Sequence, residues 1–149
     1  MSGLPHCAST TVEDPLLQRA IPVHDPLTAF FWSSGADGKL RVMCCGECNR
    51  YIHPPSVPCP RCLSPDVRPV VVSGLGTVQA CTINVQAWVP GQQPYSIAIV
   101  ELVEQHGLRL TSNVVGCAPE AVHIGQQVRA VFLHCNEIYY PVFVPAVAD

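Results

Sequence analysis

Two Cys-x-x-Cys pairs constrain this chain more than any other feature: Cys45-Gly46-Glu47-Cys48 and Cys59-Pro60-Arg61-Cys62. Two residues between cysteines allow both thiolates of a pair to reach one ion from a tight turn. Two such turns, here ten residues apart, supply the four sulfurs of a tetrahedral Zn²⁺ site. Prolines in the connector stiffen it and limit the entropy lost on ordering. The pattern predicts one structural Zn²⁺ per chain, with paired disulfides or a redox dithiol as the alternatives.

A closed four-sulfur site leaves no coordination position for a substrate. The predicted metal therefore has a structural role and does not by itself indicate the function. Cys44 is an alternative first ligand through a Cys-x-x-x-Cys spacing. We favour Cys45, because its two-residue spacing matches the second pair. Cys81, Cys117 and Cys135 lie in apolar contexts and are interpreted as small core residues.

The composition is that of a folded protein with an apolar surface. The 149 residues are 48% hydrophobic and only 13% charged, and such surfaces are common in subunits of larger assemblies. The net charge is −3, and Lys39 is the single lysine. The basic surface expected of a nucleic-acid-binding protein is therefore missing, and no nucleic-acid partner is predicted.

Cysteine usage and hydropathy predict the compartment. A secretory signal peptide has a basic region followed by an apolar run, and the first residues of this sequence show neither. No stretch approaches the roughly 18 uninterrupted apolar residues of a membrane span. We expect a cytoplasmic protein without a membrane partner, whose nine cysteines are metal-bound or buried in a reducing setting.

A short helix is predicted ahead of the cysteines, with Asp25 as N-cap, Pro26 in the first turn and Gly35 at its end. Its three consecutive aromatics, Phe30-Phe31-Trp32, cannot all share one helix face. In one interpretation, Phe30 or Phe31 packs on the cysteine ribbon and the rest is core. In the other, part of the cluster docks on another subunit.

The remainder reads as short strands separated by turns. The segment 39–42 is predicted to be a strand that leads into the first Cys-x-x-Cys turn; each of these two turns is called a knuckle below. A run at 77–87 rich in β-branched residues is long enough for a strand that bends around a small barrel. Further strands are expected at 68–73, 96–104, 109–115, 127–135 and 138–144, with one helical turn at 119–122. This predicts a mainly β chain: an N-terminal helical segment at 1–40, a rubredoxin-like zinc ribbon at 41–66 and a five-stranded OB-fold barrel at 67–149. An SH3-like barrel is the alternative.

The ribbon and the barrel together carry a family resemblance. A ribbon of the form Cys-x-x-Cys-x5-Pro-Pro-x3-Cys-Pro-x-Cys leads directly into the barrel segment Ser73-Gly74-Leu75-Gly76-Thr77-Val78, and Ile124–Val128 and Pro141–Pro145 fit as well. This order resembles the acyl-CoA-associated zinc-ribbon OB-fold family, long catalogued as a domain of unknown function. Asn49 and Leu63 stand where that family usually has a glycine after each knuckle.

The resemblance implies a non-catalytic accessory subunit of a thiolase-like acyl-CoA enzyme, either a thiolase or a side-chain aldolase. The chain would stabilise that partner and help to bind or channel the CoA thioester in lipid or steroid degradation. A subunit of an acyltransferase or a condensing synthase complex is the alternative, and a nucleic-acid-binding module is a weaker one. The residues contain no catalytic constellation of their own. Candidate CoA or partner contacts are Phe30, Phe31, Trp32, Trp88, Tyr95 and Arg109.

Overall fold

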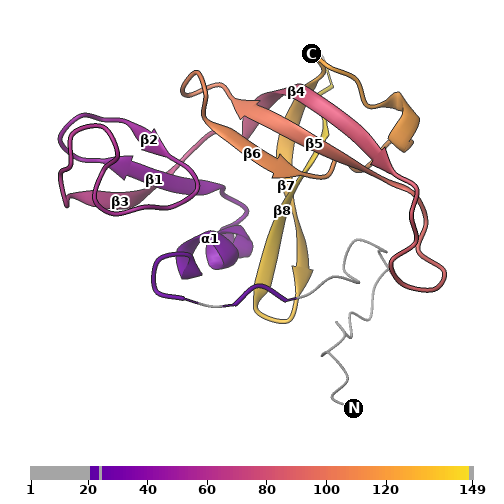
Figure 1. Cartoon of the computed structure of the whole chain (residues 1–149), viewed down its shortest axis with the longest axis horizontal. Helices are drawn as coiled ribbons and strands as arrows, with labels where there is room; N and C mark the ends of the chain where they lie inside the picture. The colour runs from indigo at the N-terminus through magenta and orange to yellow at the C-terminus, as the bar shows by residue number, and fades with distance from the viewer. Residues whose placement is uncertain (1–20, 24, 148–149) are drawn as a thin grey trace.

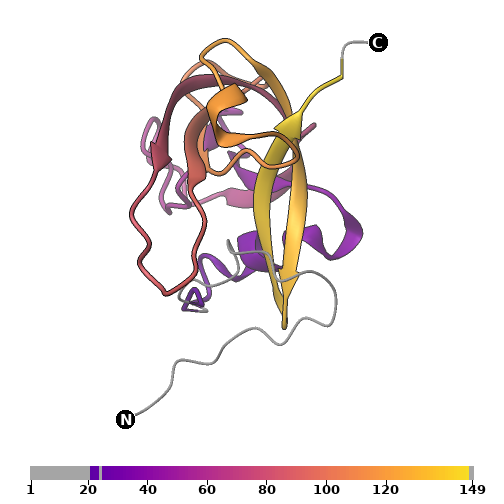
Figure 2. The same cartoon turned by 90° about the vertical axis from the view of Figure 1, so that its right-hand side faces the viewer.

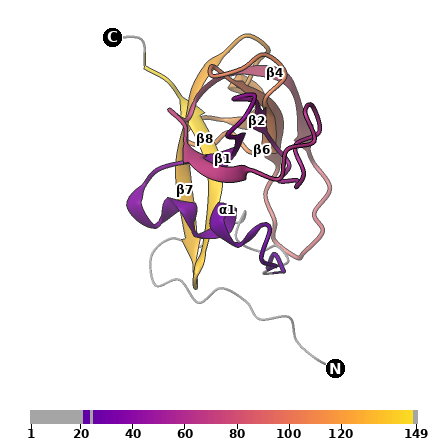
Figure 3. The same cartoon turned by 90° about the vertical axis from the view of Figure 1, so that its left-hand side faces the viewer.

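A computed structural model describes residues 21–23 and 25–147 of the chain. One short α-helix precedes a three-stranded ribbon sheet, which leads into a five-stranded barrel (Figure 1). Figure 3, seen from the ribbon end, places the helix beside the ribbon and the paired strands β7 and β8. The predicted order of helix, ribbon and barrel is confirmed.

The ribbon sheet has the strand order β2-β1-β3, with both pairings antiparallel. Strand β1 (Arg41–Cys45) begins two residues later than predicted and runs into the first knuckle. Strand β3 (Val67–Val71) pairs along the whole of β1. Strand β2 (Tyr51–Ile52) was not predicted, because two residues are too few to show a period.

The barrel sheet has the order β6-β5-β4-β7-β8 and is antiparallel throughout. The strands are β4 (Leu75–Asn84), β5 (Tyr95–Leu102), β6 (Arg109–Ser112), β7 (Gln127–Cys135) and β8 (Ile138–Pro145). A parallel bridge between Val114 and Phe143 joins the two edges of the sheet, so the barrel is nearly closed. Strand β4 ends three residues before the predicted Ala87, and the predicted turn at 119–122 is the 3₁₀ helix η3 (Pro119–Ala121).

Strict alternation along β5 shows how the barrel core forms. Ala98, Val100 and Leu102 are buried on one face, whereas Ile97 and Ile99 on the other face are only half-buried. Ser96 joins the inner face because its hydroxyl donates to the carbonyl of Val114 and accepts that residue's N–H. Figure 2 shows the hairpin of β7 and β8 extending past the barrel.

The helical segment differs from the prediction at both ends. Asp25 is not the N-cap of the helix: its Oδ1 accepts the N–H groups of Leu27 and Thr28 in the preceding turn, whereas helix α1 covers Ala29–Ser33 and has Thr28 as its N-cap. Gly35 does not end the segment. The chain continues through the 3₁₀ helix η2 (Ser34–Asp37) and leaves it at Gly38, where φ is 75°. Gly35 serves packing instead, because a Cβ there would meet the side chains of Phe132 and Tyr139.

The three aromatics of α1 reach three different neighbourhoods. Phe31 is buried in the barrel core, and its ring meets that of Trp32 edge-on. Phe30 packs against the ribbon cluster around the metal-binding cysteines. Trp32 packs near the turn end of the β7–β8 hairpin, with its ring centroid 5.9 Å from that of Tyr140. The helix therefore joins ribbon, barrel and hairpin, in agreement with the packing interpretation for Phe30, while docking on a partner stays a prediction.

The turn between β5 and β6 provides a second junction. Oε1 of Gln105 accepts the backbone N–H of Tyr51 at 2.9 Å, and Nε2 donates to the carbonyl of the same residue at 3.1 Å. The neighbouring Glu104 accepts the N–H of Ser73 in the connector between ribbon and barrel, at 2.6 Å. The barrel thus holds the outer edge of β2 and the connector by hydrogen bonds.

Candidate metal centre and ligand cleft

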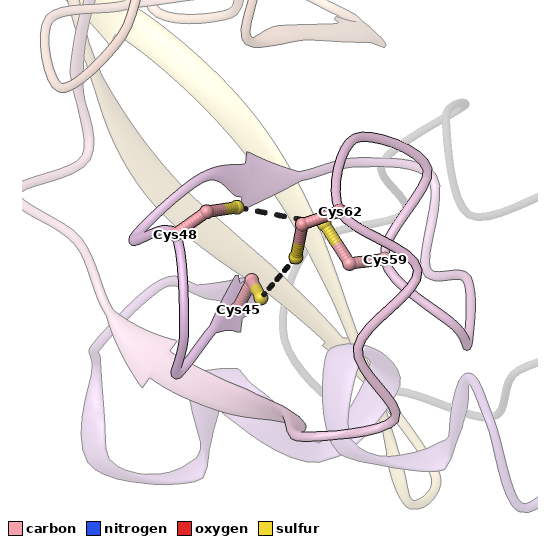
Figure 4. Close-up of side chains that lie close together, drawn as sticks. All are labelled: Cys45, Cys48, Cys59 and Cys62. Carbon is pink, nitrogen blue, oxygen red and sulfur yellow. Dashed lines mark hydrogen bonds between the residues drawn. The ribbon is translucent and has the colours of Figure 1, made fainter.

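The two knuckles bring four sulfur atoms together. The Sγ atoms of Cys45, Cys48, Cys59 and Cys62 all lie within 4.8 Å of one another. The Cys45–Cys62 and Cys48–Cys59 sulfurs are 3.5 and 3.7 Å apart (Figure 4). Cys44 is outside this cluster and its Sγ lies near the Cys45 carbonyl instead. The geometry groups the four cysteines that the spacing predicts and leaves out the alternative.

Each knuckle is closed in the same way. The N–H of Asn49 donates to the carbonyl of Cys45 at 3.0 Å, and the N–H of Leu63 donates to that of Cys59 at 2.9 Å. Both residues adopt the left-handed backbone conformation, with φ of 56° for Asn49 and 62° for Leu63. Asn adopts this conformation more readily than Leu does, so Leu63 carries strain where a glycine would carry none.

The chemistry of the cluster suits Zn²⁺. The backbone N–H groups of Cys62 and Arg61 lower the pKa of the Cys59 thiol to about 6, and the N–H groups of Cys48 and Glu47 lower the pKa of Cys45. These donors favour the thiolate form of Cys45 and Cys59, whereas the neighbouring cysteines raise the pKa of Cys62. Four sulfurs complete a tetrahedral shell, so the ion is structural: it joins the two knuckles and has no position left for a substrate.

A cleft of about 440 Å³ lies where α1, the ribbon and the barrel meet. Its walls are mainly aromatic, proline and aliphatic side chains, among them Phe31, Trp32, Pro54, Pro55, Leu110 and Tyr140. His53 lines the cleft and packs on Phe31, with the ring centroids 5.0 Å apart. Its Nδ1 is buried with no hydrogen-bond partner in the described part of the chain, and burial lowers the pKa of the imidazole. Burial therefore favours the neutral form of His53.

The structure brings only two of the six predicted contact residues, Phe31 and Trp32, into this cleft. Trp88 is 74% exposed in the loop between β4 and β5, and Tyr95 is half-buried at the start of β5. Arg109 is half-exposed and its Nε donates to Oε2 of Glu101 at 3.0 Å. Sequence reasoning missed His53 and Thr111, because neither belongs to a motif and the cleft exists only in the folded chain.

Fold and site together define a class: a zinc-ribbon protein whose ribbon leads directly into an OB-fold barrel. Residues 32–68 match "ChsH2, rubredoxin-like zinc ribbon domain", and residues 69–133 match "ChsH2, C-terminal OB-fold domain". The chain belongs to the DUF35 family of ChsH2-type proteins. These matches confirm the predicted resemblance, the OB-fold barrel and the single structural zinc.

Relatives and a solved structure support the family. The chain is 34% identical over 145 residues to a "Probable enoyl-CoA hydratase alpha subunit" of Thermomonospora curvata, covering 96% of this chain but 45% of that protein. It is 39% identical to a "DUF35 domain-containing scaffold protein" of Methanocaldococcus jannaschii, covering 62% of this chain and 67% of the relative. A chain of the "Ltp2-ChsH2(DUF35) aldolase" superposes with a TM-score of 0.77 at 35% identity, covering 85% of this chain and all of that one. The chain thus spans less than half of the hydratase subunit.

None of the helices in the described part of the chain is both long and apolar enough to cross a membrane.

Proposed function

We propose that this chain is a non-catalytic accessory subunit of a thiolase-like acyl-CoA enzyme, a thiolase or a side-chain aldolase. It stabilises its partner and helps to bind or channel the CoA thioester in a degradation pathway. The observation that carries the proposal is the match to a chain of the "Ltp2-ChsH2(DUF35) aldolase" at 35% identity, which covers 85% of this chain and all of that one. The similarity to a hydratase alpha subunit, whose name refers to a CoA substrate, supports the acyl-CoA part of the proposal.

The disposition of the histidines supports a non-catalytic role. Nδ1 of His106 lies 3.2 Å from Oε1 of Glu101 on an exposed turn, and the His134 ring stacks on Tyr139. His123 contacts the backbone of η3. In the described residues, no hydrogen bond joins any of these three to the hydroxyl or thiol that a nucleophilic mechanism would activate. The reaction is accordingly assigned to a partner's active site.

Exposed apolar side chains support a partner. Trp88 and Val85 stand out from the loop between β4 and β5, and Ile124 is exposed in the loop before β7. Large apolar side chains in solvent are typical of surfaces that another protein covers, and tryptophan is enriched among the residues that dominate interface energetics. We expect an obligate interface, on the order of 2,000 Å² or more.

The test is co-expression of the tagged chain with a thiolase-like protein from the same genome. We expect the two to co-purify in a fixed ratio, and the partner to lose activity on acyl-CoA when expressed alone. Trp88→Ser should weaken the complex, whereas Gln86→Ser in the same loop is its matched control. A partner that is fully active alone and does not co-purify would overturn the proposal, as would turnover of acyl-CoA by the isolated chain.

A further inference from the structure

The two knuckles share one backbone shape but differ in the surface that they present. Each closes on a residue in the left-handed conformation, Asn49 in the first knuckle and Leu63 in the second. The first knuckle presents polar side chains to solvent, because Glu47, Asn49 and Arg50 are exposed. The second presents Leu63, which is 73% exposed, and Val57, two residues before the knuckle, is 51% exposed. Metal binding is common to both knuckles and does not explain this difference.

The backbone of Leu63 lowers the stability of the chain. Its φ of 62° lies in the left-handed region, where the Cβ atom is crowded by the following carbonyl oxygen. In the described part of the chain, the other non-glycine residues with positive φ are Asn49 and Asn136, and asparagine adopts this conformation more readily. The steric cost of a left-handed leucine is about twice the entropic cost of a glycine. A glycine would therefore close the second knuckle at a lower free energy.

The side chain of Leu63 does not offset this cost within the chain. It stands mostly in solvent and belongs to none of the three hydrophobic clusters among the described residues, including the one around the metal-binding cysteines. Burial is what makes a leucine side chain stabilising, and here little of it is buried. Backbone strain without a structural benefit is characteristic of residues that serve a function. The benefit of this leucine therefore lies in a contact outside the chain.

The neighbours of Leu63 indicate the chemistry of that contact. Arg61 is exposed in the same knuckle and forms none of the ion pairs found among residues 21–23 and 25–147. Pro58 and Pro60 fix the backbone on both sides of Cys59, so the knuckle loses little conformational entropy when it binds. An apolar side chain beside an unpaired guanidinium complements an apolar pocket with a carboxylate at its border. Such a pocket is a feature of a protein surface.

We propose that the second knuckle anchors this chain to its thiolase-like partner. Leu63 enters an apolar pocket of that protein, Val57 covers the rim of the pocket, and Arg61 pairs with a carboxylate at its border. The polar first knuckle stays outside the contact. This assignment rests on the proposed function and adds to it the part of the chain that the partner recognises and the chemistry of the surface that recognises it.

The test measures two quantities on the same full-length, zinc-loaded variants: the urea midpoint of the isolated chain and its affinity for the thiolase-like protein of the same genome. Leu63→Gly should raise the urea midpoint, because it removes the strain. It should also weaken the complex about ten- to hundredfold, the effect of one leucine side chain that is no longer buried. Asn49→Gly changes the equivalent position of the first knuckle and is the matched control, with an affinity within about twofold of the wild type.

Two further variants give independent readings. Leu63→Asn also removes the apolar side chain but without the flexibility of a glycine, and it should weaken the complex to the same extent. Arg61→Gln should weaken the complex and reduce its dependence on salt, because the charge pair is lost.

Opposite changes in stability and affinity separate an anchor from a structural residue. The proposal is overturned if Leu63→Gly binds the partner as tightly as the wild type, if Leu63→Gly lowers the urea midpoint, or if Asn49→Gly weakens the complex equally. A wild-type chain that does not bind the partner would overturn the accessory role together with this assignment. A wild-type complex that Leu63→Gly leaves unchanged would overturn this assignment alone.

Discussion

Replacing Gln105 by Ala should loosen the ribbon from the barrel. The side-chain amide makes two hydrogen bonds to the backbone of Tyr51, at 2.9 and 3.1 Å, and both are partly buried. Each such bond contributes about 0.5–1.5 kcal/mol net, so losing both should lower the free energy of unfolding by about 1–3 kcal/mol. For a chain of this length, a loss of about 2 kcal/mol corresponds to a Tm lower by about 4–8 °C.

Urea denaturation and amide hydrogen exchange measure this prediction. The urea midpoint should fall without a change in slope, and exchange at Tyr51 should accelerate, because its N–H loses its acceptor. Gln86→Ala is the control, since the Gln86 amide bonds only the neighbouring Ala87 carbonyl on an exposed loop. If Gln105→Ala and Gln86→Ala unfold within about 0.5 kcal/mol of each other, and exchange at Tyr51 is unchanged, the junction role of Gln105 is refuted.

Three further predictions concern the metal, a packed glycine and an ion pair. Cys59→Ser should lose zinc in metal analysis and unfold the ribbon, whereas Cys44→Ser, outside the sulfur cluster, should keep it; a zinc-loaded Cys59→Ser chain would contradict the closed site. Gly35→Ala places a methyl group against Phe132 and Tyr139 and should lower the free energy of unfolding by about 1–3 kcal/mol in urea; an unchanged midpoint would show that these side chains move aside freely. The side chain of Arg109 and the N–H of Gly107 hold the pKa of Glu101 below its usual 4.5. The ionised carboxylate therefore stabilises the fold fully above the unfolded pKa, and this contribution is lost as pH falls through the lower folded pKa. Arg109→Gln should make the acid-induced loss of stability shallower in this range, and an identical pH profile would argue against the pair.

Local sequence spacing was enough to predict the ribbon and most of the barrel. The four cysteines act within two short turns, and a two-residue spacing can be read without knowing the rest of the fold. The strands at 127–135 and 138–144 were predicted within a residue, because both segments are rich in β-branched and aromatic residues and Asn136-Glu137 separates them. The two-residue β2 and the true ends of the helical segment were missed, since tertiary packing rather than periodicity determines them.

The sequence by itself therefore determined which four cysteines form the metal-binding cluster, most of the segments that become strands and the family to which the chain belongs. Only the tertiary structure decided where a ligand can lie. Tyr51 and Gln105, which connect ribbon and barrel, are 54 positions apart, and the cleft joins residues of α1, the ribbon turn, β6 and β8. No local pattern encodes the meeting of such distant segments. The cleft and the buried nitrogen of His53 exist only because the helix, the ribbon and the barrel pack against one another.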